Sequence, residues 1–414
     1  MGTEHASSTG DKSYTIVGAG VFGASTALHL IRAEPRAKNK VVRADYADID
    51  YMRLALEAKE RWANDALWKP FYHESGAYWV STTDFSQRVQ ENFKKFGVDS
   101  GLLGLPVDEA RKTYGGIFED GDYTGVKEVF INKLSGWAEA KEALRCTIEE
   151  AVRSGVEYVE ADVSKLEFDE EGATSGIVTS AGEVLRSDCV ILSTGAYTVK
   201  LLADSAPDRP ELHAGDRFVA VGVTEGFTPV SGENAAQLYG GPVGIAALPP
   251  ERGQSNGSVP HSRDRTLKFW GQTFFTNTRP HPNGRAMSSP PSEPDYAQFE
   301  VPATLKEDVD FAGKTIFGRL SDDFNTENYR VCWDALSPSA DFIISAHSAS
   351  KNLYIATIGS FHGWKFLPVL GKYVVQLLQG SLDEHWARKW AWDKALPPPP
   401  VNGCWPTKEL SDLN

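Results

Sequence analysis

The glycine pattern near the start of the chain constrains its fold more than any other feature. A short apolar run, residues 14–17, leads into Gly18-x-Gly20-x-x-Gly23 and then into a stretch of helical character at 24–33. In such a strand–turn–helix unit Gly18 permits the tight turn, Gly20 lets the backbone approach a pyrophosphate, and Gly23 lets helix and strand pack closely. The position between a strand and a helix therefore predicts a dinucleotide-binding unit rather than an accidental glycine-rich turn.

The second strand of such a unit normally follows after about 20 residues and ends in an acidic residue that binds the adenosine ribose. Here a few residues separate the helix from residues 40–45, so a literal interpretation makes Asp45 the ribose ligand. The family resemblance described below implies a different interpretation, in which the second strand and its carboxylate are absent and residues 39–43 match a later segment.

A second informative stretch lies toward the end of the chain. Residues 341–345 and 353–358 are short apolar runs that predict strands, and the second leads through a glycine-rich turn into a predicted helix over 365–378. Such a turn gathers unpaired backbone N–H groups at the positive end of the helix dipole, where Lys365 adds a full charge. This place suits an anion, or a ring that becomes anionic when it is reduced.

Three motifs in this stretch follow one another: Arg330-Val-Cys332-Trp-Asp334, Asp341-Phe-Ile-Ile344 and Gly359-Ser-Phe-His-Gly-Trp-Lys365-Phe-Leu-Pro368. In this order they resemble the fungal amadoriases (fructosyl amino acid oxidases), which are relatives of monomeric sarcosine oxidase within the D-amino-acid-oxidase-like flavoproteins. The resemblance implies FAD held covalently through the sulfur of Cys332, as 8α-S-cysteinyl FAD, and oxidation of a secondary amine by O2. On its own, Cys332 would be interpreted as a buried, inert thiol.

The resemblance covers most of the chain and implies an α/β plus α+β fold. In it, a Rossmann-like FAD-binding domain is interleaved with a mixed-sheet substrate domain, as in D-amino-acid-oxidase-like proteins. We expect the FAD-binding domain at residues 12–75, 136–215 and 328–395, the substrate domain at 76–135 and 216–327, and a C-terminal strap at 396–414. Patterning further predicts helices at 50–64, 84–95, 107–114 and from 135, strands at 74–81, 156–163, 176–179, 188–198, 217–226, 243–248 and 265–272, and an exposed loop at 280–294.

The resemblance also implies which residues bind the cofactor. They are Gly18, Ala19, Gly20, Val21, Phe22 and Gly23 in the glycine turn, Asn39, Lys40 and Arg43 beside the flavin ring, Val163 at the adenine, Ser193, Thr194 and Gly195 in a small-residue turn, Cys332, and Phe361, His362, Gly363, Trp364 and Lys365 in the last turn. Taken singly, Val163 and the Ser-Thr-Gly turn also fit an ordinary strand exit. Their recurrence in the family's order favours the site.

Lys268 and Lys365 are the predicted catalytic residues. Lys268 matches the family lysine whose charge stabilises superoxide during reoxidation by O2, and Lys365 would stabilise the reduced, anionic flavin. Without the family context, Lys268 would be a solvated lysine at the end of a strand.

The predicted substrate residues are Arg43, Trp270, Gln272 and Phe274. The amadoriases have a glutamate four residues after the lysine, whereas this chain has Gln272 among aromatic residues, which argues for a flatter and more apolar amine than a fructosyl group. We expect an N-methyl or N-alkyl amine or amino acid, with Arg43 or Lys365 holding a carboxylate. A fructosyl amino acid oxidase, a nicotinamide-dependent dehydrogenase and a flavin-binding protein without turnover are the alternatives.

Net charge, cysteine content and the absence of targeting segments limit the binding partners and the location that we expect. A formal net charge of −14 argues against nucleic acid or an anionic membrane, since both require a basic face. The four cysteines, Cys146, Cys189, Cys332 and Cys404, are too scattered for a disulfide framework or a metal site. With a polar N-terminus, no long apolar segment and no peroxisomal Ser-Lys-Leu ending, we expect a cytoplasmic monomer that acts on a small-molecule amine and O2.

Overall fold

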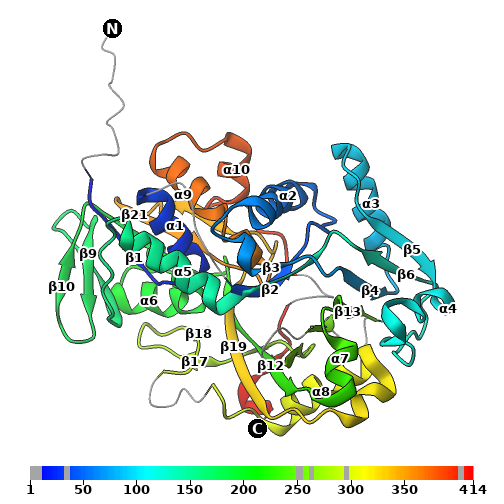
Figure 1. The fold of residues 1–414 in the computed structure, drawn as a ribbon. Helices are drawn as coiled ribbons and strands as arrows, with labels where there is room; N and C mark the ends of the chain where they lie inside the picture. Colours follow the sequence, from blue (N-terminus) through cyan, green and yellow to red (C-terminus); the bar gives the residue numbers. More distant parts are fainter. Residues whose placement is uncertain are drawn as a thin grey trace.

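The structure is a computed structural model that describes residues 12–31, 38–248, 255–260, 265–292, 298–399 and 405–413, without the side chains of residues 38–40 and 234. It contains a small, mostly parallel sheet with helices packed against it and a large mixed sheet, which lies below the small one in Figure 1. The chain passes between these parts several times, as expected for interleaved domains.

The small sheet has four strands in the order β1 (Tyr14–Val17), β11 (Cys189–Leu192), β21 (Leu353–Thr357) and β20 (Ile343–Ala346). The first three run parallel and the last is antiparallel. Helix α1 (Val21–Ile31) packs against α5 (Ala140–Arg153) and α9 (Leu370–Leu378). A three-stranded antiparallel sheet of β8 (Val163–Phe168), β9 (Thr174–Thr179) and β10 (Val184–Arg186) contacts β11. The predicted Rossmann-like unit is present.

The glycines of the first turn are required by close backbone approaches. A Cβ on Gly23 would lie 1.8 Å from the carbonyl oxygen of Gly18, so any side chain there would separate helix α1 from the turn. Gly18 itself has φ +101°, and a Cβ at this position would lie 2.6 Å from the carbonyl oxygen of Ser193. Around Gly20 the space is open, with nothing within 4 Å of a Cβ. The strand–turn–helix prediction is therefore confirmed, including the free approach to Gly20.

The first strand lies at an edge of its sheet. Within the described residues β11 is the only strand paired with β1, whereas β2 (Lys38–Val42) pairs with β7 (Gly136–Glu139) in a separate sheet. Asp45 is buried and accepts hydrogen bonds from the side chains of Asn132 and Ser135. The literal interpretation of Asp45 as a ribose ligand is therefore wrong, and the topology agrees with a missing second strand.

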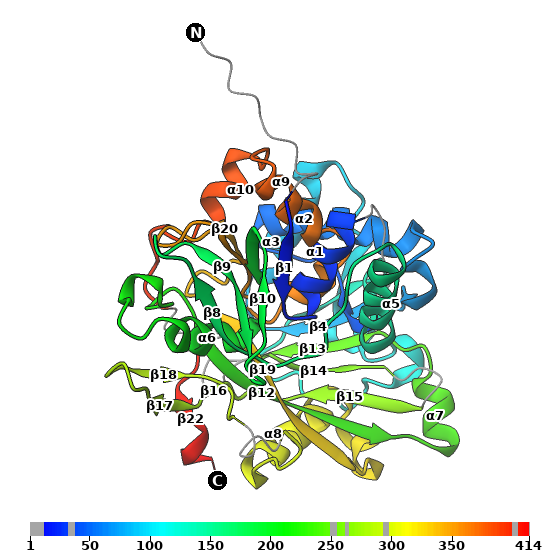
Figure 2. The ribbon, with the colours of Figure 1, turned by 90° about the vertical axis from the view of Figure 1, so that its left-hand side faces the viewer.

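The large sheet has ten strands among the described residues. In order they are β22 (Lys408–Glu409), β16 (Phe275–Thr276), β12 (Val219–Pro229), β15 (Thr266–Trp270), β14 (Asn256–Val259), β13 (Val243–Ala247), β4 (Ala77–Ser81), β6 (Glu128–Asn132) and β5 (Leu102–Pro106), with β19 (Asn328–Leu336) paired antiparallel to β12. Helix α8 (Ala303–Phe317) contacts β12 to β15 and lies beneath them in Figure 2.

Shorter elements complete the chain. They are α2 (Ile49–Asn64), β3 (Tyr72–His73), α3 (Phe85–Phe96), α4 (Val107–Ala110), α6 (Thr198–Ser205), α7 (Gly232–Leu238), β17 (Thr278–Pro280), β18 (Ala286–Ser288) and α10 (Glu384–Lys389). Helix α2 agrees with the predicted amphipathic helix, and Asp48 caps it by accepting hydrogen bonds from the N–H groups of Asp50 and Tyr51.

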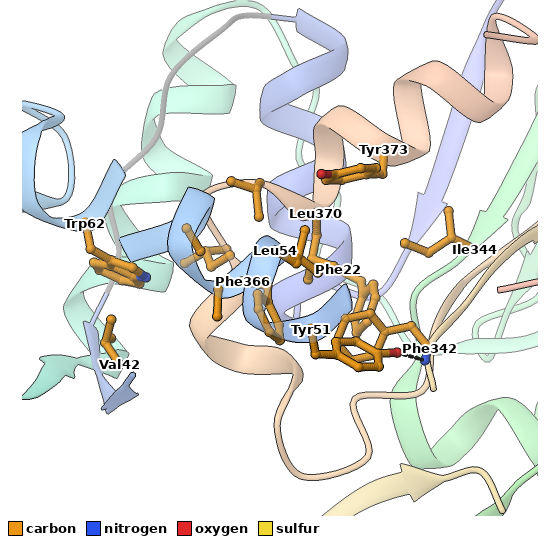
Figure 3. Packing of buried hydrophobic residues seen from close by; sticks show 14 of the residues in the cluster. Phe22, Val42, Tyr51, Leu54, Trp62, Phe342, Ile344, Phe366, Leu370 and Tyr373 are labelled. Carbon is orange, nitrogen blue, oxygen red and sulfur yellow. Dashed lines mark hydrogen bonds between the residues drawn. The ribbon is translucent and has the colours of Figure 1, made fainter. Parts of the chain in front are cut away.

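A buried aromatic cluster joins helices α1 and α2 to the turn at residues 363–366 (Figure 3). The hydroxyl of Tyr51 on α2 accepts a hydrogen bond from the N–H of Phe342, 3.1 Å away, and the Tyr51 ring packs edge-on against that phenyl ring. Trp62, one of the largest fully buried side chains, donates its indole N–H to the carbonyl oxygen of Lys365. Residues distant in sequence thus fix the backbone of the predicted Lys365 turn.

Several predicted bounds need correction. The helix predicted over 365–378 is a 3-10 turn, η8 (Gly363–Phe366), followed by α9, because Pro368 between them has no N–H to donate. Residues 156–162 form no strand, since β8 begins at Val163, and the helix expected from 135 begins at Ala140 because β7 precedes it. The helix predicted at 107–114 ends at Ala110 in α4, since Tyr114 has φ 52°.

Three corrections concern longer segments. Strand β19 belongs to the large sheet, so residues 328–336 do not lie in the FAD-binding part as predicted. The predicted loop at 280–294 contains β18, which pairs with β17 as a hairpin, and the predicted strap contributes β22 to the large sheet. Cys404 lies outside the described residues.

Candidate active site

A cavity of about 1940 Å³ is lined by residues of both sheets. This volume exceeds the roughly 300–1,000 Å³ of a pocket for one small ligand, so a dinucleotide and a second molecule can share it. Most predicted site residues line it: Gly18, Ala19, Gly20, Val21, Phe22, Gly23, Arg43, Val163, Ser193, Thr194, Gly195, Lys268, Trp270, Phe274, Cys332, Phe361, His362, Gly363, Trp364 and Lys365.

One predicted site residue does not line this cavity, and the side chains of two others lie outside the described residues. Gln272 is not among the lining residues, because β15 ends at Trp270 and the chain turns toward α8, where the N–H of Thr273 donates to the Asp308 carboxylate at 2.8 Å. The substrate contact of Gln272 stays a prediction. The side chains of Asn39 and Lys40 lie outside the description, and their backbone forms part of β2.

The turn after β21 contains unusual backbone geometry. Ile358, Ser360 and Phe361 all have positive φ, at 71°, 46° and 60°, which is costly for residues with side chains. The carboxylate of Asp334 on β19 supports the turn by accepting the N–H of Phe361 at 2.8 Å. A Cβ on Gly359 would lie 2.8 Å from this carboxylate, which explains the glycine. Strain held by a half-buried carboxylate at one place is typical of a functional turn.

Two cations flank one tyrosine where this turn meets β2. The buried ammonium of Lys365 donates to the Tyr46 hydroxyl and to the carbonyl oxygen of His362, each at 2.9 Å. The Arg43 guanidinium lies 5.0 Å from the centre of the Tyr46 ring and 4.8 Å from that of Trp79. Both cations line the cavity. Their side chains therefore form a site for an anionic group.

His362 completes a hydrogen-bonded chain behind this site. Its Nδ1 lies 3.1 Å from the Tyr46 hydroxyl and its Nε2 2.8 Å from the carbonyl oxygen of Ala340. Burial, reinforced by the positive charge of Lys365, lowers the pKa of His362 to about 3. The imidazole is thus neutral at physiological pH, donating from Nε2 and accepting from Tyr46 at Nδ1. This neutrality leaves the positive charge of the site on Lys365 and Arg43.

A second charged cluster lies on the face of the large sheet that lines the cavity. The buried carboxylate of Glu225 on β12 bonds to the ammonium of Lys268 through one oxygen and to Nη2 of Arg330, 2.8 Å away, through the other. Strand pairing explains the cluster, since Glu225 is opposite Arg330 on β19 and opposite Trp270 on β15. Two cations share one carboxylate, so the cluster retains a net positive charge.

Aromatic rings line the cavity between these two clusters. The rings of Phe274 and Phe361 stack with their centres 4.6 Å apart, joining the end of β15 to the strained turn. The indole N–H of Trp270 donates to the carbonyl oxygen of Ser255 at 3.1 Å, which leaves the ring face for apolar contact. A flat or apolar group fits this part of the cavity better than a polyhydroxylated one.

Comparison with known proteins identifies the family of this chain. The profile of the family described as DAO, FAD dependent oxidoreductase, matches residues 13–377. The chain belongs to this family of FAD-dependent oxidoreductases. Relatives include the L-saccharopine oxidase of Schizosaccharomyces pombe, 27% identical over 93% of this chain and 94% of that protein, and the amino acid oxidase imqH of Aspergillus flavus, 24% identical over 89% and 93%.

Solved structures agree with this oxidoreductase family. The fructosyl peptide oxidase from E. terrenum superposes with a TM-score of 0.82 at 21% identity, covering 98% of this chain and 97% of that one. The fructosamine oxidase (Amadoriase II) from Aspergillus fumigatus has a TM-score of 0.76 at 25% identity, covering 94% and 91%. The predicted fold, and the resemblance to the amadoriases among FAD-dependent oxidases, are confirmed.

The cavity of this oxidoreductase fits FAD along the glycine turn. Open space at Gly20 would admit a pyrophosphate, and the buried hydroxyl of Ser193 has no hydrogen-bond partner among the described residues, so it is available to a ligand. Within the described residues no strand flanks the free edge of β1, so a carboxylate at the end of such a strand is absent.

Three residues of the site were not identified from the sequence. Tyr46 and Asp334 support the strained turn from distant segments, and Glu225 joins the two cations of the large sheet. For Glu225 a signal existed, because a carboxylate inside the apolar run of a predicted strand needs a charged partner. Tyr46 carried no comparable signal. Over the described residues there is no cluster of potential metal ligands and no helix long and apolar enough to cross a membrane.

Proposed function

We propose that this oxidoreductase oxidises a secondary amine that bears a carboxylate, such as an N-alkyl amino acid, to an imine, with O2 as acceptor and hydrogen peroxide as product. The observation that carries the proposal is the pair of cations, Arg43 and Lys365, which both contact Tyr46 and line the cavity. The names of the relatives, which describe oxidases of saccharopine and of amino acids, support an amino-acid substrate.

Each part of the cavity has a task in this reaction. FAD, when bound, supplies a ring that accepts a hydride from the carbon beside the amine nitrogen. Arg43 and Lys365 hold the substrate carboxylate, so that this carbon is fixed in position. The rings of Trp270, Phe274 and Phe361 exclude water from the amine. Lys268 supplies a positive charge in the cavity, which stabilises superoxide formed during reoxidation.

The proposal includes the covalent link of FAD, 8α-S-cysteinyl through Cys332. Cys332 lines the cavity on the same face of β19 as Arg330 and Asp334, because side chains two residues apart share a face of a strand. A link at this point would compensate for the missing contacts at the adenosine end. The predicted monomeric state and cytoplasmic location stay predictions from composition.

A fructosyl amino acid oxidase is the second candidate, favoured by the likeness to the fructosamine oxidase structure. Glu225, a carboxylate that lines the cavity, has both oxygens bonded to cations. Sugar hydroxyls left without partners there would each cost about 1–3 kcal/mol. This cost favours an apolar N-substituent.

Replacing Arg43 tests the carboxylate site. We expect Arg43→Met to raise KM for an N-methyl amino acid about 10- to 100-fold, since a hydrogen bond to a charged group contributes about 1.5–3 kcal/mol. KM for the matching carboxamide should change little. Steady-state peroxide assays on both substrates measure the difference, with exposed Arg53→Met on α2 as the control. An equal loss for both substrates would show that Arg43 does not bind the carboxylate.

A further inference from the structure

The strand that carries Cys332 places a second reactive group on the same face. Arg330 is two residues earlier on β19, and pairing with β12 puts Glu225 opposite Arg330 and Val223 opposite Cys332. Of these residues Glu225, Val223 and Cys332 line the cavity. The sulfur therefore shares its surface with an ion pair whose carboxylate is buried, rather than with apolar side chains alone.

The guanidinium of Arg330 is held by an ion pair, but not all of its N–H donors have a hydrogen-bond partner. Its Nη2 is 2.8 Å from Glu225, while its buried Nε–H has no hydrogen-bond partner among the described residues. Burial lowers the pKa of Arg330, but Glu225 and Cys332 raise it above its usual value, with Cys332 acting both through its charge and as a hydrogen-bond partner. A rigid cation with a donor to spare thus lies beside the sulfur.

We propose that Arg330 is a positioning residue that holds Cys332 as the thiolate which forms the thioether to FAD. The proposal rests on the covalent link of the proposed function. A thiolate, not a thiol, is the nucleophile, and nearby arginine favours that form. Glu225 orients the guanidinium, and Lys268 balances the second carboxylate oxygen, so that Glu225 does not cancel the charge of Arg330.

The bond changes of attachment balance with O2 as the oxidant. The sulfur of Cys332 forms a bond to the 8α carbon of the flavin, and one C–H bond at that carbon breaks. The thiolate's electron pair becomes the new S–C bond, while the proton and the electron pair of the broken C–H bond pass to the ring, which is thereby reduced by two electrons. Molecular oxygen and one further proton then restore the oxidised ring and give one molecule of hydrogen peroxide. Arg330 takes no part in these bonds and acts only through the charge on sulfur.

Rates of attachment test this role. Protein made without flavin in a riboflavin-starved host is mixed with FAD, and bound flavin is followed by fluorescence of the denatured polypeptide. We expect Arg330→Gln, which keeps a donor for Glu225, to slow attachment about ten- to thirtyfold at pH 7, because a cysteine of ordinary pKa near 8.5 is only about 3% thiolate there. Its rate should approach wild type near pH 9.5. Arg330→Lys should lie between the two, and Arg319→Met, which removes an exposed arginine paired with Asp120, should match wild type.

Each outcome is decisive. Slow attachment that recovers at high pH supports the proposal. If FAD attaches to Arg330→Gln at the wild-type rate, the proposal is wrong. If attachment is equally slow at every pH, the proposal is also wrong, because Arg330 then has a purely structural role. Absence of bound flavin in the wild type would instead contradict the covalent link itself. Thermal unfolding of each variant separates loss of folding from loss of reactivity.

Discussion

Lys268→Met is expected to slow reoxidation of the reduced flavin by about 100- to 1000-fold, the usual effect of removing one group that stabilises developing charge. Lys268 lines the cavity, where its ammonium is held by Glu225. A fixed cation lowers the energy of superoxide formed when the first electron reaches O2. Reduction of the flavin by substrate needs no such charge and should change little. Stopped-flow measurement of the two half-reactions separates the effects.

The control for this variant is Lys372→Met, which removes a partly exposed lysine paired with Glu57 on α2. Both half-reactions of that variant should match wild type. If Lys268→Met loses reduction and reoxidation equally, Lys268 has a structural role, as an anchor of Glu225 and through it of Arg330.

Cys332→Ala is expected to release all of the yellow colour into the supernatant after acid precipitation, whereas wild type retains it with the protein. The first reason is that Cys332 lines the cavity, where it can bond to the flavin. The second is that the described residues place no strand, and so no ribose-binding carboxylate, beside β1 to strengthen reversible binding. We further expect this variant to lose FAD on gel filtration. Absorbance of pellet and supernatant measures the first effect, and flavin content of the eluted protein the second.

Cys146→Ala is the matched control, because Cys146 is a half-buried cysteine on α5 that is not among the residues lining the cavity. It should keep its colour in the pellet. Release of colour from wild type would contradict the covalent link, and retention by Cys332→Ala would place the link elsewhere.

The sequence predicted the parts of the site that are local in the chain. The glycine spacing of both turns is visible in short stretches of sequence, although the contacts that require Gly18 and Gly359 come from Ser193 and Asp334, which are distant in the chain. That no described strand pairs with the free edge of β1 agrees with the sequence, since too few residues lie between α1 and residue 40. Periodicity and turn chemistry act over short distances, so these features are visible without a structure.

The rest of the site depends on contacts between distant segments. Lys365 and Tyr46 are separated by 319 residues, and the bond between them defines the anion site. Gln272 shows the same dependence on distant contacts. Its predicted role assumed that β15 continues past Trp270, but Asp308 on α8 draws the chain out of the strand through the N–H of Thr273. Residue spacing within a predicted strand does not show where a contact from a distant helix ends that strand.

The central claim, oxidation of an N-alkyl amino acid, is tested most directly by peroxide release from N-methyl aromatic amino acids and fructosyl amino acids, assayed side by side on the same preparation. We predict hydrogen peroxide from the N-methyl compounds, with kcat/KM at least about tenfold higher than for the fructosyl compounds, since each unpaired sugar hydroxyl costs about 1–3 kcal/mol. A clear preference for the fructosyl amino acids would contradict the account.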